Sequence, residues 1–168
     1  MTDLKTVIAS NRQAVTDFLT TAGALAPSTW GRPRAPGKWS PGQATEHLVL
    51  TYELGRSILH GTFHGSAAPR VVRALIRVLF LKRILRRGRF GRPTKTLEPL
   101  EPAASPASPD VLAARLQAAA TAFEEDMESA ARSGQATLDH PFFGKVHLDD
   151  YVRFQVIHTH HHRTQLAS

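Results

Sequence analysis

The sequence predicts an all-α fold, a four-helix bundle built as one domain over residues 1–168. Its length is that of a single domain with one hydrophobic core. Apolar residues recur at three- and four-residue spacing in several segments, as on the buried face of a helix, and no segment shows a convincing strand pattern. We expect four main helices and one additional helix, near residues 3–24, 40–62, 110–133, 148–166 and 68–86.

The second helix has the clearest beginning. It follows the motif SPGQ, in which Ser40 is an N-cap, Pro41 occupies the first helical position and Gln43 can close a capping box. A helix of ordinary length from this start should end near Gly61 or Gly65, since glycine is common just beyond a helix.

The other main helices have weaker boundary signals. Thr2 can cap the first helix. The third should start near Asp110 and end near Gly134. After a connection over 135–147, Asp149 and Asp150 suit the positive end of the last helix dipole.

A long connection over residues 66–109 joins the second and third helices. It begins with the basic additional helix and continues into a crossover with five prolines between Pro93 and Pro109, which deny the backbone regular hydrogen bonding. Because a long crossover can reach across the end of a bundle, the middle two helices need not be antiparallel.

The net charge of +7 is concentrated in this connection. No acidic residue lies between Glu53 and Glu98, and that interval holds eleven of the 21 basic residues, so the rest of the chain carries ten basic residues against 14 acidic ones. One interpretation is a helix that covers the mouth of the bundle or forms a homodimer interface, with its arginines in solvent. The other is a surface over residues 70–92 that docks on nucleic acid or an anionic membrane.

Composition restricts the chemistry and the compartment. The chain has no cysteine, which excludes disulfide bonds and thiolate ligands, so a metal would need histidine or carboxylate ligands. The N-terminal sequence MTDLKTVIAS lacks the pattern of a secretory signal, and no run approaches the ~20 apolar residues of a membrane span. We therefore expect a cytoplasmic protein.

Four histidines near the C-terminus, in the stretch FQVIHTHHHRTQLAS, suggest a metal site. Thr159 interrupts them within a helical pattern, which argues against a purification tag; a solvated basic patch is the other alternative. His158 and His162 are four residues apart, so on a helix they point the same way and can approach one ion. His160 and His161 cannot both join them.

The pair faces the bundle interior, because counting back along its helical face reaches Phe154 and Tyr151. Two histidines hold a divalent ion weakly, and a third ligand would leave a three-coordinate metal with open positions. His47 is the best candidate, since it lies on a mostly apolar stripe of the second helix where an unpaired imidazole is costly to bury. Taken alone, His47 would fit a core histidine hydrogen-bonded to a carbonyl.

Two stretches resemble the DinB-like (YfiT-like) superfamily of metal-dependent enzymes: KWSPGQATEHL and HPFFGKVHLDDYVRFQVIHTHHHRTQL. The resemblance extends over the whole chain and implies a four-helix bundle in up-down-down-up order. It also implies a Trp-Ser-Pro turn, three histidine ligands for a divalent metal and a glutamine after the pair. These positions fall on Trp39, Ser40, Pro41, His47, His158, His162 and Gln165. The basic segment before the crossover is a departure from typical members.

The function predicted from these features is a metal-dependent transferase or hydrolase acting on a small molecule. Members that the chain resembles include thiol S-transferases that use low-molecular-weight thiols and a thiol-dependent isomerase. Zinc and nickel both suit imidazole ligands. Gln165 could orient a ligand, whereas Glu46 should point about 100° away from its neighbour His47. We expect Phe142 and Phe143 to serve in core or gate packing more than in substrate stacking.

Other enzyme classes find little support. No Gly-x-Ser-x-Gly turn is present, and GRFGRP lacks the preceding strand that a phosphate-binding loop would need. The remaining alternative is a binding module without catalysis that docks on nucleic acid or anionic lipid through residues 70–92.

Overall fold

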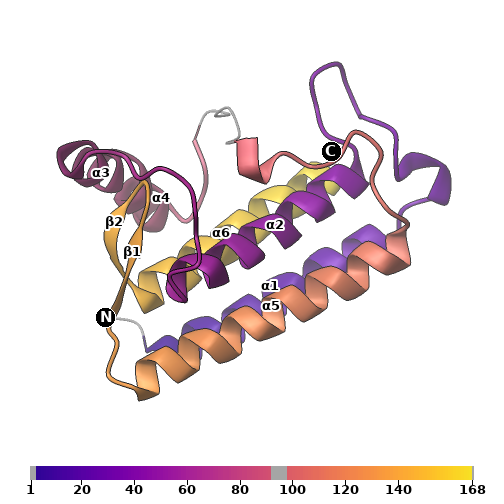
Figure 1. The fold of residues 1–168 in the computed structure, drawn as a ribbon. Coiled ribbons are helices and arrows are strands. Elements are labelled where there is room, and N and C mark those ends of the chain that lie inside the picture. Colours follow the sequence, from indigo (N-terminus) through magenta and orange to yellow (C-terminus); the bar gives the residue numbers. More distant parts are fainter. Residues whose placement is uncertain (1–2, 92–97, 168) are drawn as a thin grey trace.

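The structure is a computed structural model that describes residues 3–91 and 98–167 (Figure 1). Four long helices lie side by side. They are α1 (Leu4–Gly23), α2 (Pro41–Leu59), α5 (Pro109–Arg132) and α6 (Leu148–Ala167). α1 packs mainly along α6, and α2 mainly along α5. In Figure 1, α1 and α6 run in one direction and α2 and α5 in the other, because the long connection brings the chain back to the end at which α2 began.

The predicted start of α2 is confirmed. Gln43 N donates to Ser40 Oγ at 3.2 Å, and Ser40 N donates to Gln43 Oε1 at 3.0 Å, which completes the capping box with Pro41 at the first helical position. The helix ends at Leu59, and Gly61 follows in the left-handed region with φ +69°.

The other helix boundaries lie close to those predicted. Asp3 is the N-cap residue of α1, and the proposed cap Thr2 lies outside the described residues. α5 begins one residue before Asp110 and has Gly134 just beyond its end. The first turn of α6 contains Asp149 and Asp150, as expected.

All four long helices meet in one buried hydrogen-bond network. Tyr52 Oη of α2 donates to Asn11 Oδ1 of α1 at 2.8 Å and lies 3.0 Å from Thr159 Oγ1 of α6. Asn11 Nδ2 donates to Glu124 Oε1 of α5 at 2.8 Å. Each of these buried polar groups therefore has a partner, and the network fixes the register between α2 and α6, the helices that carry the clustered histidines.

A hydrophobic core surrounds this network. Its large, fully buried members come from all four long helices and include Phe18, Leu48, Leu116, Phe123, Met127 and Val152. Gly55 permits close packing at its centre, because a Cβ atom there would lie 2.9 Å from the Phe123 ring.

A small antiparallel sheet corrects the expectation of an all-α fold. β1 (Thr137–His140) and β2 (Gly144–His147) pair with Leu138 opposite Val146, both buried. Each strand has only four residues, too few for an alternating pattern to stand out, and the turn between them depends on Gly144 at φ +66°. The predicted connection over 135–147 is thus a hairpin, which leads directly into α6.

The basic additional helix is one helical run with a π-helical turn inside it. It consists of α3 (Arg70–Ile76), the π turn η2 (Arg77–Leu81) and α4 (Lys82–Arg87), and it ends at Gly88, which has φ +63°. We refer to residues 70–87 as the α3–α4 run. Two short 3-10 turns complete the described elements: η1 (Pro27–Thr29) before α2, and η3 (Glu98–Leu100) in the crossover.

The expectation of solvated arginines is met by Arg70, Arg83, Arg86 and Arg87, which are exposed, but two arginines differ. Arg73 Nη1 donates to Asp139 Oδ1 at 2.8 Å, and Arg77 Nη1 donates to the Lys145 carbonyl at 2.6 Å, so these arginines rest on the hairpin. Most of the apolar side is turned to solvent instead, with Val71 82% exposed. Within the described residues, no helix combines the length and apolar character needed to cross a membrane.

Candidate metal centre

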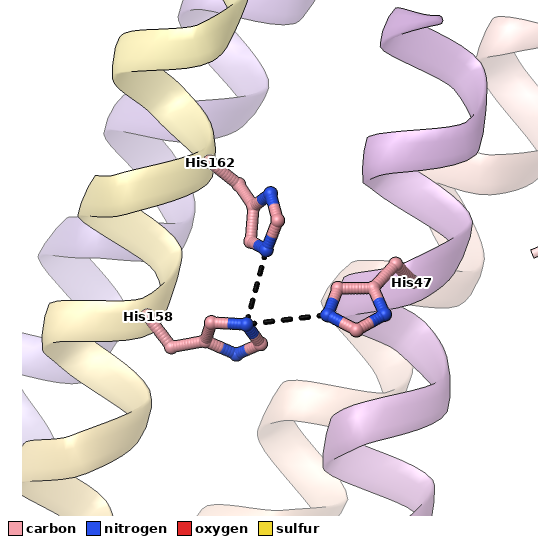
Figure 2. Close-up of side chains that lie close together, drawn as sticks. All are labelled: His47, His158 and His162. Carbon is pink, nitrogen blue, oxygen red and sulfur yellow. Dashed lines mark hydrogen bonds between the residues drawn. The ribbon is translucent and has the colours of Figure 1, made fainter. Parts of the chain in front are cut away.

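His47, His158 and His162 come together between α2 and α6 (Figure 2). His158 Nε2 lies 3.2 Å from His47 Nε2 and 3.0 Å from His162 Nε2. All three side chains are buried. The structure thus unites the three residues selected from the sequence, with one nitrogen of each ring pointing at the same small space.

The outer nitrogens of two rings determine where their protons lie. His47 Nδ1 is 2.8 Å from the carbonyl oxygen of Leu100 in η3, and because a carbonyl can only accept, Nδ1 carries the hydrogen. His162 Nδ1 is 2.8 Å from Gln165 Oε1 and is fixed in the same way. The inner Nε2 atom of each ring therefore presents a lone pair. His158 Nδ1 is buried and has no hydrogen-bond partner among the residues that the structure describes.

Among the described residues, no positively charged group lies between the three inward-facing Nε2 atoms to accept their lone pairs. A proton on His158 Nε2 could satisfy only one of the two lone pairs that face it, whereas a divalent cation can accept all three. The donor set contains imidazoles alone, which suits zinc or nickel and does not suit the oxygen-seeking calcium or magnesium ions. The residues present therefore fit a divalent transition-metal ion.

Burial keeps the three rings neutral. Desolvation lowers the pKa of His47 to about 4, against a smaller opposite effect from the Leu100 carbonyl. It also lowers the pKa of His162 to about 3 and that of His158 well below its ordinary value, with further lowering from the neighbouring histidines. A neutral imidazole is the form that binds metal, so protons compete weakly for these nitrogens near pH 7.

A cavity of about 1380 Å³ opens beside the three histidines. Aromatic side chains form much of its wall: Trp39, Phe80, Phe90, Phe142, Phe143 and Phe154. The Trp39 ring centre lies 4.6 Å from that of His47, and the Phe90 ring centre lies 5.3 Å from that of His158. The cavity therefore offers a largely apolar surface for a ligand that reaches the histidines.

His140 is a cavity residue that sequence reasoning did not select. Its Nδ1 accepts hydrogen bonds from the backbone N–H groups of Phe142 and Phe143, at 3.2 and 3.3 Å. Burial lowers its pKa to about 3, so the ring is neutral and must carry its single hydrogen on Nε2. The only local signal was a histidine just before the turn residues PFFG, and that signal does not reveal the tautomer.

Other residues considered from the sequence lie outside the triad or at its edge. Glu46 Oε2 accepts from the Ala103 N–H at 3.0 Å, away from the histidines. His160 is exposed, and His161 Nε2 lies 3.1 Å from Gln165 Nε2. Gln165 thus touches both His161 and His162 through its amide.

The two phenylalanines after His140 both line the cavity. Phe143 is buried and stacks on His140 with ring centres 4.4 Å apart, whereas Phe142 is half-buried. Packing therefore accounts for Phe143, while Phe142 has surface left toward the cavity.

A protein-family model matches residues 11–166, nearly the whole chain, and the family it describes is the DinB superfamily. The chain belongs to the DinB superfamily. Among solved structures, this DinB superfamily protein is similar to YfiT from Bacillus subtilis, with 18% sequence identity and a TM-score of 0.57 over 98% of this chain and 85% of that one. YfiT is described as a probable metal-dependent hydrolase with an unusual four-helix bundle topology. Curated protein sequences give no match.

Proposed function

We propose that His47, His158 and His162 bind one divalent metal ion and that the protein is a metal-dependent enzyme acting on a small molecule. The observation that carries the proposal is the convergence of three imidazole Nε2 atoms. Two of these atoms, in His47 and His162, present a lone pair because the Nδ1 atom of the same ring donates its hydrogen to a fixed acceptor. The lowered pKa values support it, because they keep all three donors unprotonated near neutral pH.

The chemistry of such an ion follows from its ligands. Three neutral imidazoles cancel none of its charge and leave positions open, so a bound ion would polarise a substrate oxygen or lower the pKa of a water or thiol. A structural site would be expected to close the fourth position with a side chain, and among the described residues the group of candidate ligands consists of the three histidines.

The nucleophile must come from outside the chain. There is no cysteine, and among the described residues the hydroxyl groups that line the cavity belong to Thr51 and Tyr151. Thr51 Oγ1 donates to the Leu48 carbonyl at 2.8 Å, and burial raises the pKa of the Tyr151 hydroxyl, which makes its nucleophilic anion harder to form. Water as the nucleophile gives hydrolysis, and a low-molecular-weight thiol gives S-transfer to an electrophile. The description of YfiT supports hydrolysis as the first of these two alternatives.

The chain's own residues would position the substrate. The aromatic wall holds an apolar group and keeps water from it, and the hydrogen on His140 Nε2 provides a donor for a substrate oxygen. Gln165 would hold the His162 ring in the orientation that aims Nε2 inward. Each of these roles requires only a neutral side chain.

Elemental analysis of protein without a histidine tag tests the metal site. We expect close to one zinc or nickel ion per chain, lost in His47→Ala and retained in the matched control His160→Ala, whose ring is exposed. Equal loss from both variants would indicate a loose histidine patch and would remove the proposal.

Activity assays then separate the two reactions. Turnover of esters or amides without added thiol, abolished by His47→Ala, would establish a hydrolase. Turnover of an epoxide or alkyl halide only with added thiol would establish an S-transferase. Inactivity in both assays with metal bound would contradict the enzymatic part of the proposal.

A further inference from the structure

The α3–α4 run carries a surface that the proposed function does not use. Its solvent side is apolar in the first half, where Val71 and Leu79 are 82% and 61% exposed. We call this surface the apolar patch; its members are Val71, Val72, Leu75, Val78 and Leu79. Apart from Val111 on α5, these are the exposed large hydrophobic residues of the described chain, so exposed apolar surface is gathered at one place.

Exposed cations flank this patch in the sequence, one before it and five after it. We call them the cationic group; its members are Arg70, Lys82, Arg83, Arg86, Arg87 and Arg89. Among the described residues, no carboxylate lies within ion-pairing distance of any of the six. Arginines on the four-helix bundle differ, since Arg12, Arg56 and Arg163 each have a carboxylate oxygen within 2.8 Å. The cationic group thus has charge available for an external anion.

The outward direction of the apolar patch is built into the packing. Arg73 and Arg77 bind the hairpin, and Ala68 N donates to the Pro141 carbonyl just before the run begins. On the inner side, Leu81 and Ile84 are buried in the core. The run is therefore held at both sides, and rotating the patch inward would break two arginine contacts and expose core residues.

We propose that the α3–α4 run docks the protein on an anionic lipid bilayer. The apolar patch would enter the interface between headgroups and acyl chains, while the cationic group would contact the anionic headgroups. This proposal does not depend on the metal centre or on catalysis.

A bilayer explains both halves of the surface better than the other occupants. In a two-fold dimer each patch meets its own copy, so the six cations would face six more, with no acidic residue between 54 and 97 to separate them. Nucleic acid would engage the cations but leave five aliphatic side chains against phosphate or water. Stacking on bases needs exposed aromatic rings, and Phe80 and Phe90 line the cavity instead.

Docking in this position would place the cavity beside the lipid. Leu75 and Leu79 belong to the apolar patch and also line the cavity. The cavity wall would then be continuous with the bilayer interface, so an apolar ligand could pass between them along aliphatic side chains.

Vesicle flotation with the full chain tests the proposal. We expect the protein to float with vesicles of phosphatidylcholine mixed with phosphatidylglycerol and not with phosphatidylcholine alone. Binding should weaken strongly at about 1 M salt, where the Debye length is about 3 Å. Val71→Glu/Val78→Glu should abolish flotation, and Arg83→Gln/Arg86→Gln should lower the partition coefficient about 30-fold.

Two controls make the result specific. Val111→Glu changes an exposed apolar residue on α5 and should leave flotation unchanged. His47→Ala should also float normally, so failure of the metal proposal would be distinguishable from failure of this one. Circular dichroism checks that each variant retains its helices.

Three outcomes would overturn the proposal. One is that the protein floats with neither type of vesicle. Another is salt-sensitive binding to duplex DNA that survives Val71→Glu/Val78→Glu, which would assign the cations to nucleic acid. The third is loss of a dimer in that double variant without any vesicle binding, which would assign the apolar patch to a second copy.

Discussion

The candidate metal centre and the α3–α4 run each contain groups without a partner, and the two missing partners have opposite charge. The centre buries three neutral imidazoles whose inner nitrogens converge, so the missing partner is a cation. The run and the residues just after it carry the six exposed cations of the cationic group, which have no carboxylate within ion-pairing distance among the described residues, so this region lacks an anion. In each region the groups left without a partner indicate the chemistry of the ligand, and the degree of burial indicates its size: a single ion between helices, or an extended surface outside them.

Removing the proposed ion should have the largest effect on the free energy of unfolding, because an ion that binds only the folded protein stabilises the whole fold. At a free metal concentration 100-fold above Kd, binding adds about 2.7 kcal/mol to the free energy of unfolding. Differential scanning calorimetry should show a higher Tm with zinc or nickel, reversed by a chelator. His162→Ala should lose this metal-dependent rise and His160→Ala should keep it; a rise of equal size in both would break the contrast between the buried and the exposed histidines.

Gln165 should have the next largest effect, since it hydrogen-bonds His162, one of the three proposed ligands. Gln165→Ala leaves His162 Nδ1 without its partner, and loss of such a partner lowers metal affinity about 10–100-fold. Competition against a chromophoric chelator measures this affinity. The matched control is Thr164→Ala, whose exposed hydroxyl donates to the His161 carbonyl. Equal affinity in the Gln165→Ala and wild-type proteins would show that the contact has no role in binding.

His140 should make stability depend on pH. Its pKa is about 3 in the folded protein against 6.5 for an exposed imidazole, so the unfolded state binds the proton more readily. The stability contributed by the neutral ring is complete above pH 6.5 and declines as pH falls from there toward about 3, by about 1.4 kcal/mol per pH unit.

Chemical denaturation across this pH range tests the assignment. His140→Asn retains an acceptor for the two backbone N–H groups but cannot titrate in this range. The free energy of unfolding of this variant should therefore fall less steeply with decreasing pH, by about 1.4 kcal/mol per pH unit. Metal-free protein is used for both, which leaves the contribution of the metal-site histidines common to them. An unchanged slope would contradict the lowered pKa of the buried His140 ring.

The contact of Arg73 with the hairpin should have the smallest effect. Asp139 is 63% exposed, and ion pairs that solvent reaches typically contribute about 0–1 kcal/mol, so Arg73→Ala should change the free energy of unfolding by less than about 1 kcal/mol. Loss of the ion from the buried histidines would then destabilise the protein more than loss of this solvent-exposed ion pair. A loss of several kcal/mol would instead mean that the α3–α4 run stabilises the bundle.

Local signals in the sequence predicted the parts of the structure that depend on neighbouring residues. The capping box needs only Ser40 and Gln43, and the pairing of His158 with His162 needs only one helical turn. His47 could be added because two histidines without a third ligand are a poor site. The contact of its Nδ1 with the Leu100 carbonyl could not be predicted, since it depends on the path of a crossover 53 residues away.

The errors arose where distant residues decided the local structure. The hairpin over 137–147 has strands too short for a visible period and is recognised through its pairing and the positive φ of Gly144. One interpretation of the sequence places the arginines of the additional helix in solvent, but the hairpin offers Asp139 to Arg73 and a backbone carbonyl to Arg77. The apolar side of this part of the run is turned outward instead. The sequence contains both partners but does not show that they meet.

X-ray absorption spectroscopy at the metal edge tests the central claim most directly, because it reports the atoms bound to the ion. Protein loaded with one equivalent of zinc should show three imidazole nitrogens at about 2.0–2.1 Å. The multiple-scattering signal of imidazole should fall in His47→Ala and remain unchanged in His160→Ala. A shell made mainly of oxygen, or a spectrum that is the same in both variants, would contradict a site formed by His47, His158 and His162.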